Sequence, residues 1–384
     1  MLDEAMTAEE IYYASTKDGW DLGIRRYKPK EGKNKVLNPV VLCHGFAANK
    51  MSVDYSKKGT KEWQRYSLAA YLSEGHGGDV AFDVWVPELR GRGLSQTYDP
   101  EKNPEKYNWS IDEYIDFDIP ALLNCIQNTY LQENNTKPKI VWIGKSMGGM
   151  LIYAYGQKTS SRKMLKAVVV MGSPMSFRHS SNLVKMITRL SPRKLTGPIH
   201  VLERLSEDTI LTEMVIQNLS SDDGVEAEVL DSYINEGLAN TLSLKVVEHF
   251  ASCIRHGVFT RFPKHPWWYD LFDFLSRRQK IPLLSNRFVP HNYSKNLWKF
   301  VHPLLVITGT NDRIADLKDV QYGYNHAASV EKKMIVLKKG AKDEQGNVFC
   351  QNDYGHIDLN LGKSVHEEVY PAIYRWLSYQ CKKQ

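Results

Sequence analysis

One short motif restricts the fold of this 384-residue chain more than any other feature. An apolar run at 139–143 leads into the motif Gly-Lys-Ser-Met-Gly at 144–148, and a second apolar run follows it. This order predicts a strand, a tight turn and a helix, with Ser146 at the turn. Such a turn strains the backbone of the serine and lifts its hydroxyl away from the chain. Gly144 and Gly148 are needed because a β-carbon at either position would collide with the strand or the helix.

The composition is that of an ordinary globular protein. Hydrophobic residues make up 42% of the chain and charged residues 24%, which is enough for a large core in one domain with an insertion, or in two domains. The formal net charge of +6 is spread over short basic pairs. This pattern is more typical of solvated surfaces than of nucleic-acid binding. No apolar run has the length of a bilayer span, so we expect at most transient contact with a membrane surface.

The cysteines point to a reducing compartment. Their odd number and spacing match neither a metal site nor a disulfide framework; they are Cys43, Cys125, Cys253, Cys350 and Cys381. The first residues are acidic and contain no apolar signal core. We therefore expect a cytoplasmic protein without a bound metal.

Strand and helix patterns alternate on both sides of the motif. Asp18 and Gly19 separate two strand-like runs and predict a hairpin turn. Further apolar runs predict strands at 39–43, 81–87, 167–172, 303–309 and 333–337. Strands that alternate with helices predict a mostly parallel central sheet with helices on both of its faces.

Three helices can be assigned around this sheet. Helical spacing predicts helices at 63–73 and at 365–377. A capping-box pattern at 110–113 opens a third helix. Pro120 requires this third helix either to kink or to restart with Asp118 as a new cap.

The alternation fails in one long segment. We interpret residues 174–298 as a largely helical cap inserted into a core made of 1–173 and 299–384. Helical patterns occur within the insertion at 209–216 and 241–254. Its aromatic residues either contact an acyl chain or form the cap's own core; they are Phe259, Phe262, Trp267, Trp268, Tyr269, Phe272 and Phe274.

A nucleophilic serine needs an imidazole that takes its proton and a carboxylate that orients the imidazole. In a parallel sheet both come from loops at the carboxyl ends of later strands. Asp312 lies in the loop after strand 303–309, and His356 lies just before the final helix. Asp316 and Asp319 are competing acids, but an N-cap role in the next helix is the simpler explanation for them.

The early strand at 39–43 ends in His44, Gly45 and Phe46. A strand that ends in this way can bring backbone N–H groups beside the nucleophile. We expect the N–H groups of Phe46 and Met147 to form an oxyanion hole, with His44 and Gly45 supporting the turn. A plain turn is the alternative interpretation.

These residues resemble the α/β-hydrolase superfamily over nearly the whole chain, and within it the acid-lipase-like and bacterial esterase/lipase branch. The matching segments are 44–46, 82–91, 109–120, 144–149, 309–312 and 355–358. The resemblance implies hydrolysis of carboxylic esters through an acyl-serine intermediate, with a cap over an acyl pocket. The chain departs from that branch at Lys145, where histidine is frequent.

The sequence thus predicts a serine hydrolase with the α/β-hydrolase fold that cleaves small-molecule or lipid esters and needs no cofactor. Amide or peptide hydrolysis and acyl transfer are alternatives on the same residues. A ligand sensor that keeps the fold without catalysis is an alternative of another class.

Overall fold

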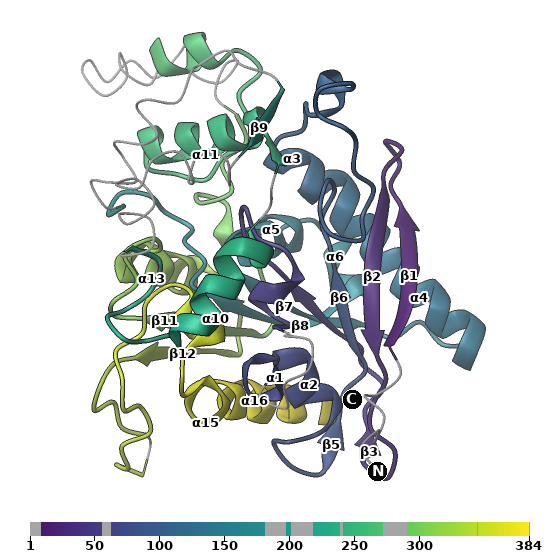
Figure 1. The fold of residues 1–384 in the computed structure, drawn as a ribbon, viewed down its shortest axis with the longest axis vertical. Helices are drawn as coiled ribbons and strands as arrows, with labels where there is room; N and C mark the ends of the chain where they lie inside the picture. The colour runs from purple at the N-terminus through teal and green to yellow at the C-terminus, as the bar shows by residue number, and fades with distance from the viewer. Residues whose placement is uncertain are drawn as a thin grey trace.

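The computed structural model describes residues 9–55, 63–180, 197–200, 218–238, 241–271, 290–343 and 345–383. At its centre lies an eight-stranded sheet (Figure 1). In spatial order the strands are β1 (Glu9–Ser15), β2 (Asp21–Tyr27), β6 (Val84–Pro87), β4 (Val40–Cys43), β7 (Ile140–Lys145), β8 (Leu165–Met171), β11 (Leu304–Gly309) and β12 (Lys332–Leu337). The six strands from β6 to β12 run parallel, and β2 pairs antiparallel with both β1 and β6.

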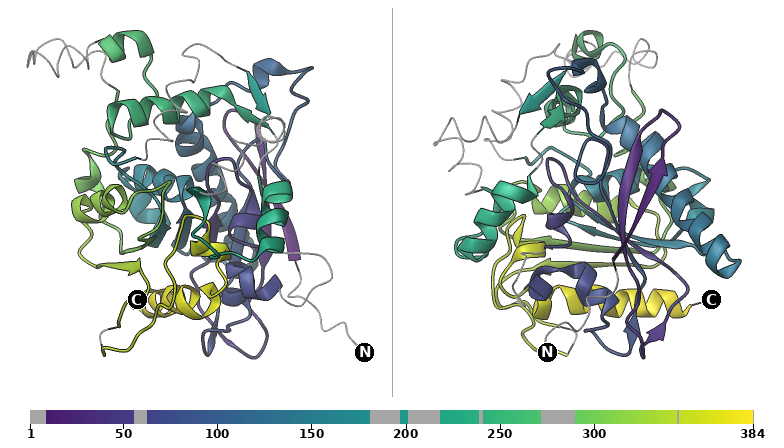
Figure 2. Two further views of the ribbon diagram at one scale, coloured as in Figure 1. Left: turned by 60° about the vertical axis from the view of Figure 1, so that its left-hand side comes forward. Right: turned by 45° about the vertical axis from the view of Figure 1, so that its right-hand side comes forward.

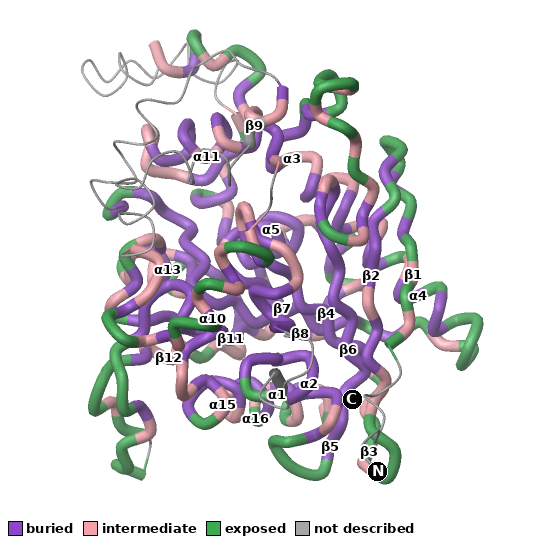
Figure 3. Tube along the Cα trace, viewed as in Figure 1, coloured by how far each residue is buried: buried purple, intermediate pink, exposed green. Residues whose placement is uncertain are grey.

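The central strands are buried on both faces, as their uninterrupted apolar runs predict (Figure 3). Alternate residues of one strand enter two different core clusters. In β7, Trp142 packs into the first cluster and Val141 into the second. In β8, Val168 and Val169 divide in the same way. The sheet therefore separates two hydrophobic layers, each closed by helices.

The helices belong to one layer or the other. The first layer contains α3 (Ile111–Glu113), α4 (Ile119–Asn134), α5 (Met147–Gly156), α6 (Ser161–Met164) and α13 (Leu317–His326). The second contains α1 (Trp63–Tyr66), α2 (Leu68–Ser73), α14 (Asp358–Leu361), α15 (Val365–Glu368) and α16 (Tyr370–Lys382), most of which lie at the bottom of Figure 1. The prediction of a mostly parallel sheet with helices on both faces is confirmed. Among the described helices, none has both the length and the apolar character that a bilayer span requires.

Two predicted elements are each divided into two. The helix predicted at 63–73 breaks at Ser67, whose hydroxyl caps α2 at Ala70 N–H and donates to the buried carboxylate of Asp54. The strand predicted at 81–87 breaks at Asp83, so that β5 (Val80–Ala81) pairs with the short β3 (Asn34–Lys35) instead of continuing β6.

The helix that contains Pro120 continues through a π-helical turn rather than restarting. The capping box of Ser110 and Glu113 is present, and a π-helical turn, Tyr114–Asp118, joins α3 to α4. This wide turn accommodates the proline, which has no N–H for the helix ladder. Asp118 makes no capping hydrogen bond and instead binds the Arg90 guanidinium at 2.5 and 2.8 Å. The alternative of Asp118 as a new cap is therefore wrong.

Two of the described helices of the insertion lie apart from each other (Figure 2). Helix α11 (Leu244–His256) lies across the top, next to an antiparallel pair that the sequence did not predict, β9 (Pro198–His200) and β10 (Thr241–Ser243). Helix α10 (Ala227–Ser232) lies lower, away from α11. The helical pattern at 209–216 falls outside the described residues, and the boundaries of the insertion stay predictions.

Candidate active site

Ser146 occupies the sharp turn between β7 and α5. Its φ of 53° and ψ of −118° are unusual for a residue with a side chain and indicate local strain. A β-carbon on Gly148 would lie 2.5 Å from the Cys43 carbonyl oxygen, and one on Gly144 would lie 2.4 Å from the Gly148 carbonyl carbon. Both positions therefore require glycine, because the two strands and the helix approach closely around the serine.

The structure brings Ser146, His356 and Asp312 into one line of contacts. The Nε2 atom of His356 is 3.0 Å from Ser146 Oγ, and its Nδ1 atom is 2.7 Å from Asp312 Oδ2. With the proton on Nδ1, the imidazole donates to Asp312 and accepts from the serine hydroxyl. The three residues come from the ends of β7 and β11 and from the loop before α14, 210 and 44 positions apart along the chain.

Asp312 is buried and held as an anion. Its Oδ1 atom accepts the backbone N–H groups of Ile314 at 3.0 Å and Ala315 at 2.7 Å. Burial alone would raise the pKa of this carboxyl, but the charge and hydrogen bond of His356 and the charge of Lys145 lower it overall. A charged Asp312 can fix the orientation of the imidazole.

The competing acids have other partners. Asp316 caps α13 by accepting the N–H of Lys318 at 2.8 Å. Asp319 is buried and binds the backbone N–H and the ring of His179, at 3.0 and 3.1 Å. Neither is recorded in contact with His356.

The imidazole of His356 is itself almost fully buried, at 6% exposed. Burial is the largest cause of its lowered pKa, which the Lys145 charge lowers further and the Asp312 charge opposes. A neutral imidazole at neutral pH is the form that accepts a proton. The insertion supports this loop, because Leu219 O accepts the N–H of Ile357 at 2.8 Å.

The end of β4 lies directly beside the serine. A β-carbon on Gly45 would be 3.0 Å from the Ser146 Cβ and 3.6 Å from its Oγ. Among the described residues, the backbone N–H groups of Phe46 and Met147 have no recorded acceptor. The structure thus leaves two backbone donors unengaged in the residues adjoining Gly45 and Ser146, as an oxyanion hole requires.

His44 supports this turn from inside the protein. Its Nδ1–H donates to Gly45 O at 3.0 Å and its Nε2 accepts Leu89 N–H at 3.1 Å. Burial, with the nearby Arg92 charge, lowers the pKa of His44 to about 3, so that the ring is neutral. His44 therefore has a structural role and does not take part in the line of contacts at Ser146.

Two charged residues near the site were not assigned a role from the sequence. Arg92 is buried and donates from Nη1 to the carbonyl oxygens of Gly45 at 3.2 Å and Ala48 at 2.8 Å. It thus holds the loop that carries Phe46. Lys145 is buried beneath the line of contacts, with its Nζ 2.7 Å from His356 O. The only sequence signal for either is a basic residue within a glycine-rich turn.

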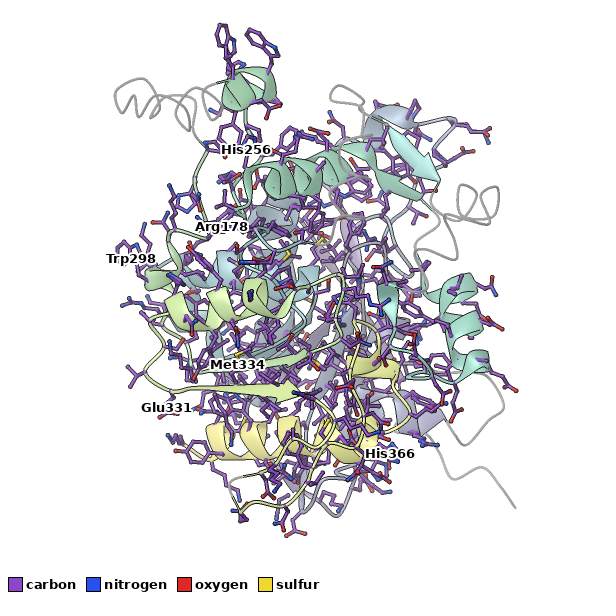
Figure 4. The ribbon with its side chains drawn as sticks, turned by 90° about the vertical axis from the view of Figure 1, so that its left-hand side faces the viewer. Arg178, His256, Trp298, Glu331, Met334 and His366 are labelled. Atoms are coloured by element: carbon purple, nitrogen blue, oxygen red, sulfur yellow. The ribbon has the colours of Figure 1, made fainter. Side chains whose placement is uncertain are left out.

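The described members of the predicted aromatic cluster lie in different surroundings. Phe259 is buried against Tyr293, and the Tyr269 ring lies 4.1 Å from the ring of His256 at a tilt of 45°. His256 lies below the outermost helix (Figure 4). Trp267 and Trp268 contact each other and are 60% and 43% exposed. Phe272 and Phe274 lie outside the described residues.

A different aromatic group lies beside the site. The Phe46 ring is 4.9 Å from the Phe250 ring of α11, which is 6.5 Å from the ring of Phe177. These three rings come from separate parts of the chain, so no local pattern indicates that they meet. They provide apolar surface next to the candidate oxyanion hole.

The arrangement is suited to acyl transfer. It combines a strained serine, a neutral base in hydrogen-bond reach, a buried carboxylate and two backbone donors. Within the described part of the chain, no cluster of three or more histidine, cysteine or acidic side chains is placed to hold a metal ion. All five cysteines are free thiols.

Nearly the whole chain is similar in sequence to lipase and lipase-like proteins and in fold to an esterase. The tear acid lipase-like protein of Mesocricetus auratus is 25% identical over 387 residues, which cover 94% of this chain and 85% of the relative. Lipase member K of Homo sapiens is 22% identical over 389 residues, which cover 95% and 86%. A solved structure of a thermophilic esterase from Thermogutta terrifontis has the same fold, with a TM-score of 0.56, 19% identity and coverage of 97% and 100%.

The sequence pattern of one protein family matches most of the chain. This family is described by the alpha/beta hydrolase fold, and the match spans residues 38–341. It includes β4, the turn at Ser146 and the loop of Asp312. The chain belongs to the α/β hydrolase fold family.

Proposed function

We propose that this protein is a serine hydrolase that cleaves carboxylic esters through an acyl-serine intermediate. Ser146 is the nucleophile, His356 is the general base and acid, and Asp312 orients His356. The observation that carries the proposal is the unbroken line from Ser146 Oγ to His356 Nε2 at 3.0 Å and from His356 Nδ1 to Asp312 Oδ2 at 2.7 Å.

In the first half of the reaction, Ser146 Oγ attacks the ester carbonyl carbon while its proton passes to His356 Nε2. The carbonyl oxygen becomes an oxyanion that accepts the N–H groups of Phe46 and Met147. The intermediate then collapses, the bond from carbon to the alcohol oxygen breaks, and the alcohol takes the proton from His356 Nε2. The product is an acyl ester on Ser146.

In the second half, a water molecule attacks the acyl carbon and gives a proton to His356. Breaking the bond to Ser146 Oγ releases the carboxylic acid, and His356 returns the proton to the serine. Asp312 stays ionised throughout and stabilises the imidazolium that forms in each half.

Two observations support esters as the substrates. The similar proteins named above are a lipase and an acid lipase-like protein, and a similar fold occurs in an esterase. The rings of Phe46, Phe177 and Phe250 also offer an apolar wall for an acyl chain. If an alcohol replaced water as the acyl acceptor, the same residues would catalyse acyl transfer.

The test is a comparison of p-nitrophenyl esters of increasing acyl length with the matching p-nitroanilides, with and without an added alcohol as acceptor. We expect ester hydrolysis to exceed amide hydrolysis for every acyl chain, and free acid to be the main product. Faster anilide cleavage would identify an amidase, and predominant ester exchange an acyltransferase. A folded protein that cleaves neither would favour the ligand sensor.

The pH dependence of kcat/KM should report the state of His356. Because burial lowers its pKa below the ordinary value of 6.5, the imidazole is neutral and active above that lowered pKa. Activity is lost only as the pH falls through it, when protonation removes the base. We expect the acid limb to have its midpoint below pH 6.5, measured with an ester whose product absorbs independently of pH. A midpoint above 6.5 would contradict this account of the base.

A further inference from the structure

A buried lysine lies directly under the proposed catalytic residues. Lys145 ends β7 and is only 4% exposed. Its Nζ donates to the carbonyl oxygen of His356 at 2.7 Å, across 211 positions of the chain. A buried ammonium is costly unless charges and hydrogen bonds compensate it, so its retention there calls for nearby anions.

Two carboxylates provide that compensation. Asp312 and Asp358 both raise the pKa of Lys145 by their charge, against the larger lowering by burial. Gly172, at a φ of +55°, leaves room beside this group, since a β-carbon there would be 3.0 Å from Lys145 Nζ and 3.1 Å from Asp312 Oδ2. The ammonium therefore shares one small space with the carboxylate that orients His356.

Asp358 holds the His356 loop from its other end. Its Oδ2 accepts the N–H groups of Gly355 at 2.6 Å and of Ser221 at 2.9 Å, and Ser221 also donates its hydroxyl to it. Its Oδ1 is buried and has no hydrogen-bond partner among the described residues. Burial raises the pKa of Asp358, and the hydrogen bonds from Ser221 and Gly355 together with the charge of Lys145 act against that rise.

The charged groups that face Lys145 are thus Asp312, Asp358 and the imidazole of His356. When both acids are ionised and the imidazole is neutral, the two carboxylates and the ammonium leave a single buried negative charge. Protonation of His356 during the reaction brings the group to neutrality. Without the ammonium, two carboxylates would remain uncompensated, and His356 would be driven toward its protonated, inactive form.

We propose that Lys145 is a positioning residue for catalysis: its ammonium holds the His356 main chain and keeps Asp312 and Asp358 charged while His356 stays neutral. This inference rests on the proposed function. It assigns a role to a position of the turn motif at which this chain departs from the branch it resembles.

The cation is also the group that limits activity at alkaline pH. Burial lowers the pKa of Lys145 to about 8, so the ammonium is present at neutral pH and is lost as the pH rises through that value. Loss of the proton removes both the charge and one donor from the carbonyl of His356. Activity should therefore fall above about pH 8 in the unmodified protein.

The test compares Lys145→Met with the unmodified protein in two ways: the pH profiles of kcat and KM, and the titration of His356 by NMR with carbon-13 histidine. The His356 signal is identified by its loss in His356→Asn. In Lys145→Met we expect kcat to fall on the order of a hundredfold through misplacement of the base, with KM little changed. We also expect the His356 midpoint to move up and the alkaline limb to disappear.

Three further variants sharpen the comparison. Lys163→Met removes an exposed lysine of α6 and should behave as the unmodified protein. Lys145→Gln replaces Lys145→Met if the latter does not fold. Asp358→Asn removes a negative charge that raises the pKa of His356, so its midpoint should move down, opposite to Lys145→Met.

The inference would be overturned if Lys145→Met had the kcat and the His356 midpoint of the unmodified protein. It would also be overturned if the His356 midpoint moved in the same direction in Lys145→Met and Asp358→Asn. The NMR titration needs no turnover and therefore separates the two proposals. If the protein cleaves no ester but the His356 midpoint moves up in Lys145→Met and down in Asp358→Asn, only the proposed function is refuted. An active protein without these shifts refutes only the role of Lys145.

Discussion

Ser146→Ala should lower kcat for ester hydrolysis on the order of a millionfold, with little change in thermal stability. The methyl group cannot attack the carbonyl, and neither His356 nor Asp312 can replace the missing bond to the acyl group. The strained backbone of the turn is retained, since alanine has the same β-carbon. The measurement is steady-state hydrolysis of a p-nitrophenyl ester, with a thermal melt of the same sample.

The chain offers a matched control for this variant. The hydroxyl of Ser161 is 2.8 Å from the Nε2 atom of His302, so it forms a second pair of serine and histidine. That pair is buried, and Ser161 Oγ also lies 2.6 Å from Lys158 O and 3.0 Å from Gly156 O, either of which can accept its one proton. Ser161→Ala should keep full activity. The assignment fails if Ser161→Ala is inactive in a folded protein while Ser146→Ala is not.

Asp312→Asn should lower kcat by about 10⁴-fold while leaving the fold intact. The side-chain amide keeps the size of the carboxylate but can present an N–H toward Nδ1, which favours the tautomer that cannot accept the Ser146 proton. It also removes the negative charge that stabilises the imidazolium. The measurement is kcat with the same ester, together with the melting temperature.

Asp316→Asn is the control for this prediction. Asp316 caps α13 through the N–H of Lys318, and asparagine caps helices about as well as aspartate. Activity and stability should both stay near those of the unmodified protein. If Asp316→Asn lost most of its activity while Asp312→Asn stayed active, Asp316 would be the acid that orients His356.

Local sequence patterns predicted most of the fold because they act over short stretches. The apolar run before Gly144 became β7, and the capping box at Ser110 opened α3, since burial and capping are decided within a few residues. The order of strands also placed Asp312 and His356 in the loops that meet at Ser146. What the sequence alone established at the site was the position of each loop.

Features that depend on distant partners could not be predicted in this way. Asp83 interrupts a strand because Arg26 and Tyr130 bind its carboxylate, at 2.8 and 2.6 Å. The buried contacts of Lys145 and Arg92 likewise join segments that are far apart in the chain. Nothing in the local pattern distinguishes such a residue from a solvated lysine or arginine.

The insertion was predicted least well for the same reason. Its helical pattern at 241–254 corresponds to α11 only from Leu244 on, because 241–243 pair with β9 as β10. The described aromatic residues of the expected cluster include a buried Phe259 and an exposed pair of tryptophans. Trp298, near its end, is 63% exposed and projects from the surface (Figure 4). The rings that reach the site, Phe177 and Phe250, are brought there by the packing of the insertion on the core.

Covalent capture of the nucleophile tests the central claim most directly. A fluorophosphonate reacts only with a serine that a neighbouring base activates, and mass spectrometry of the peptides locates the adduct. The account predicts one adduct per chain, on Ser146, that is absent in His356→Asn although this variant retains the serine. An adduct on another residue, or an unmodified Ser146 in the folded protein, would contradict it.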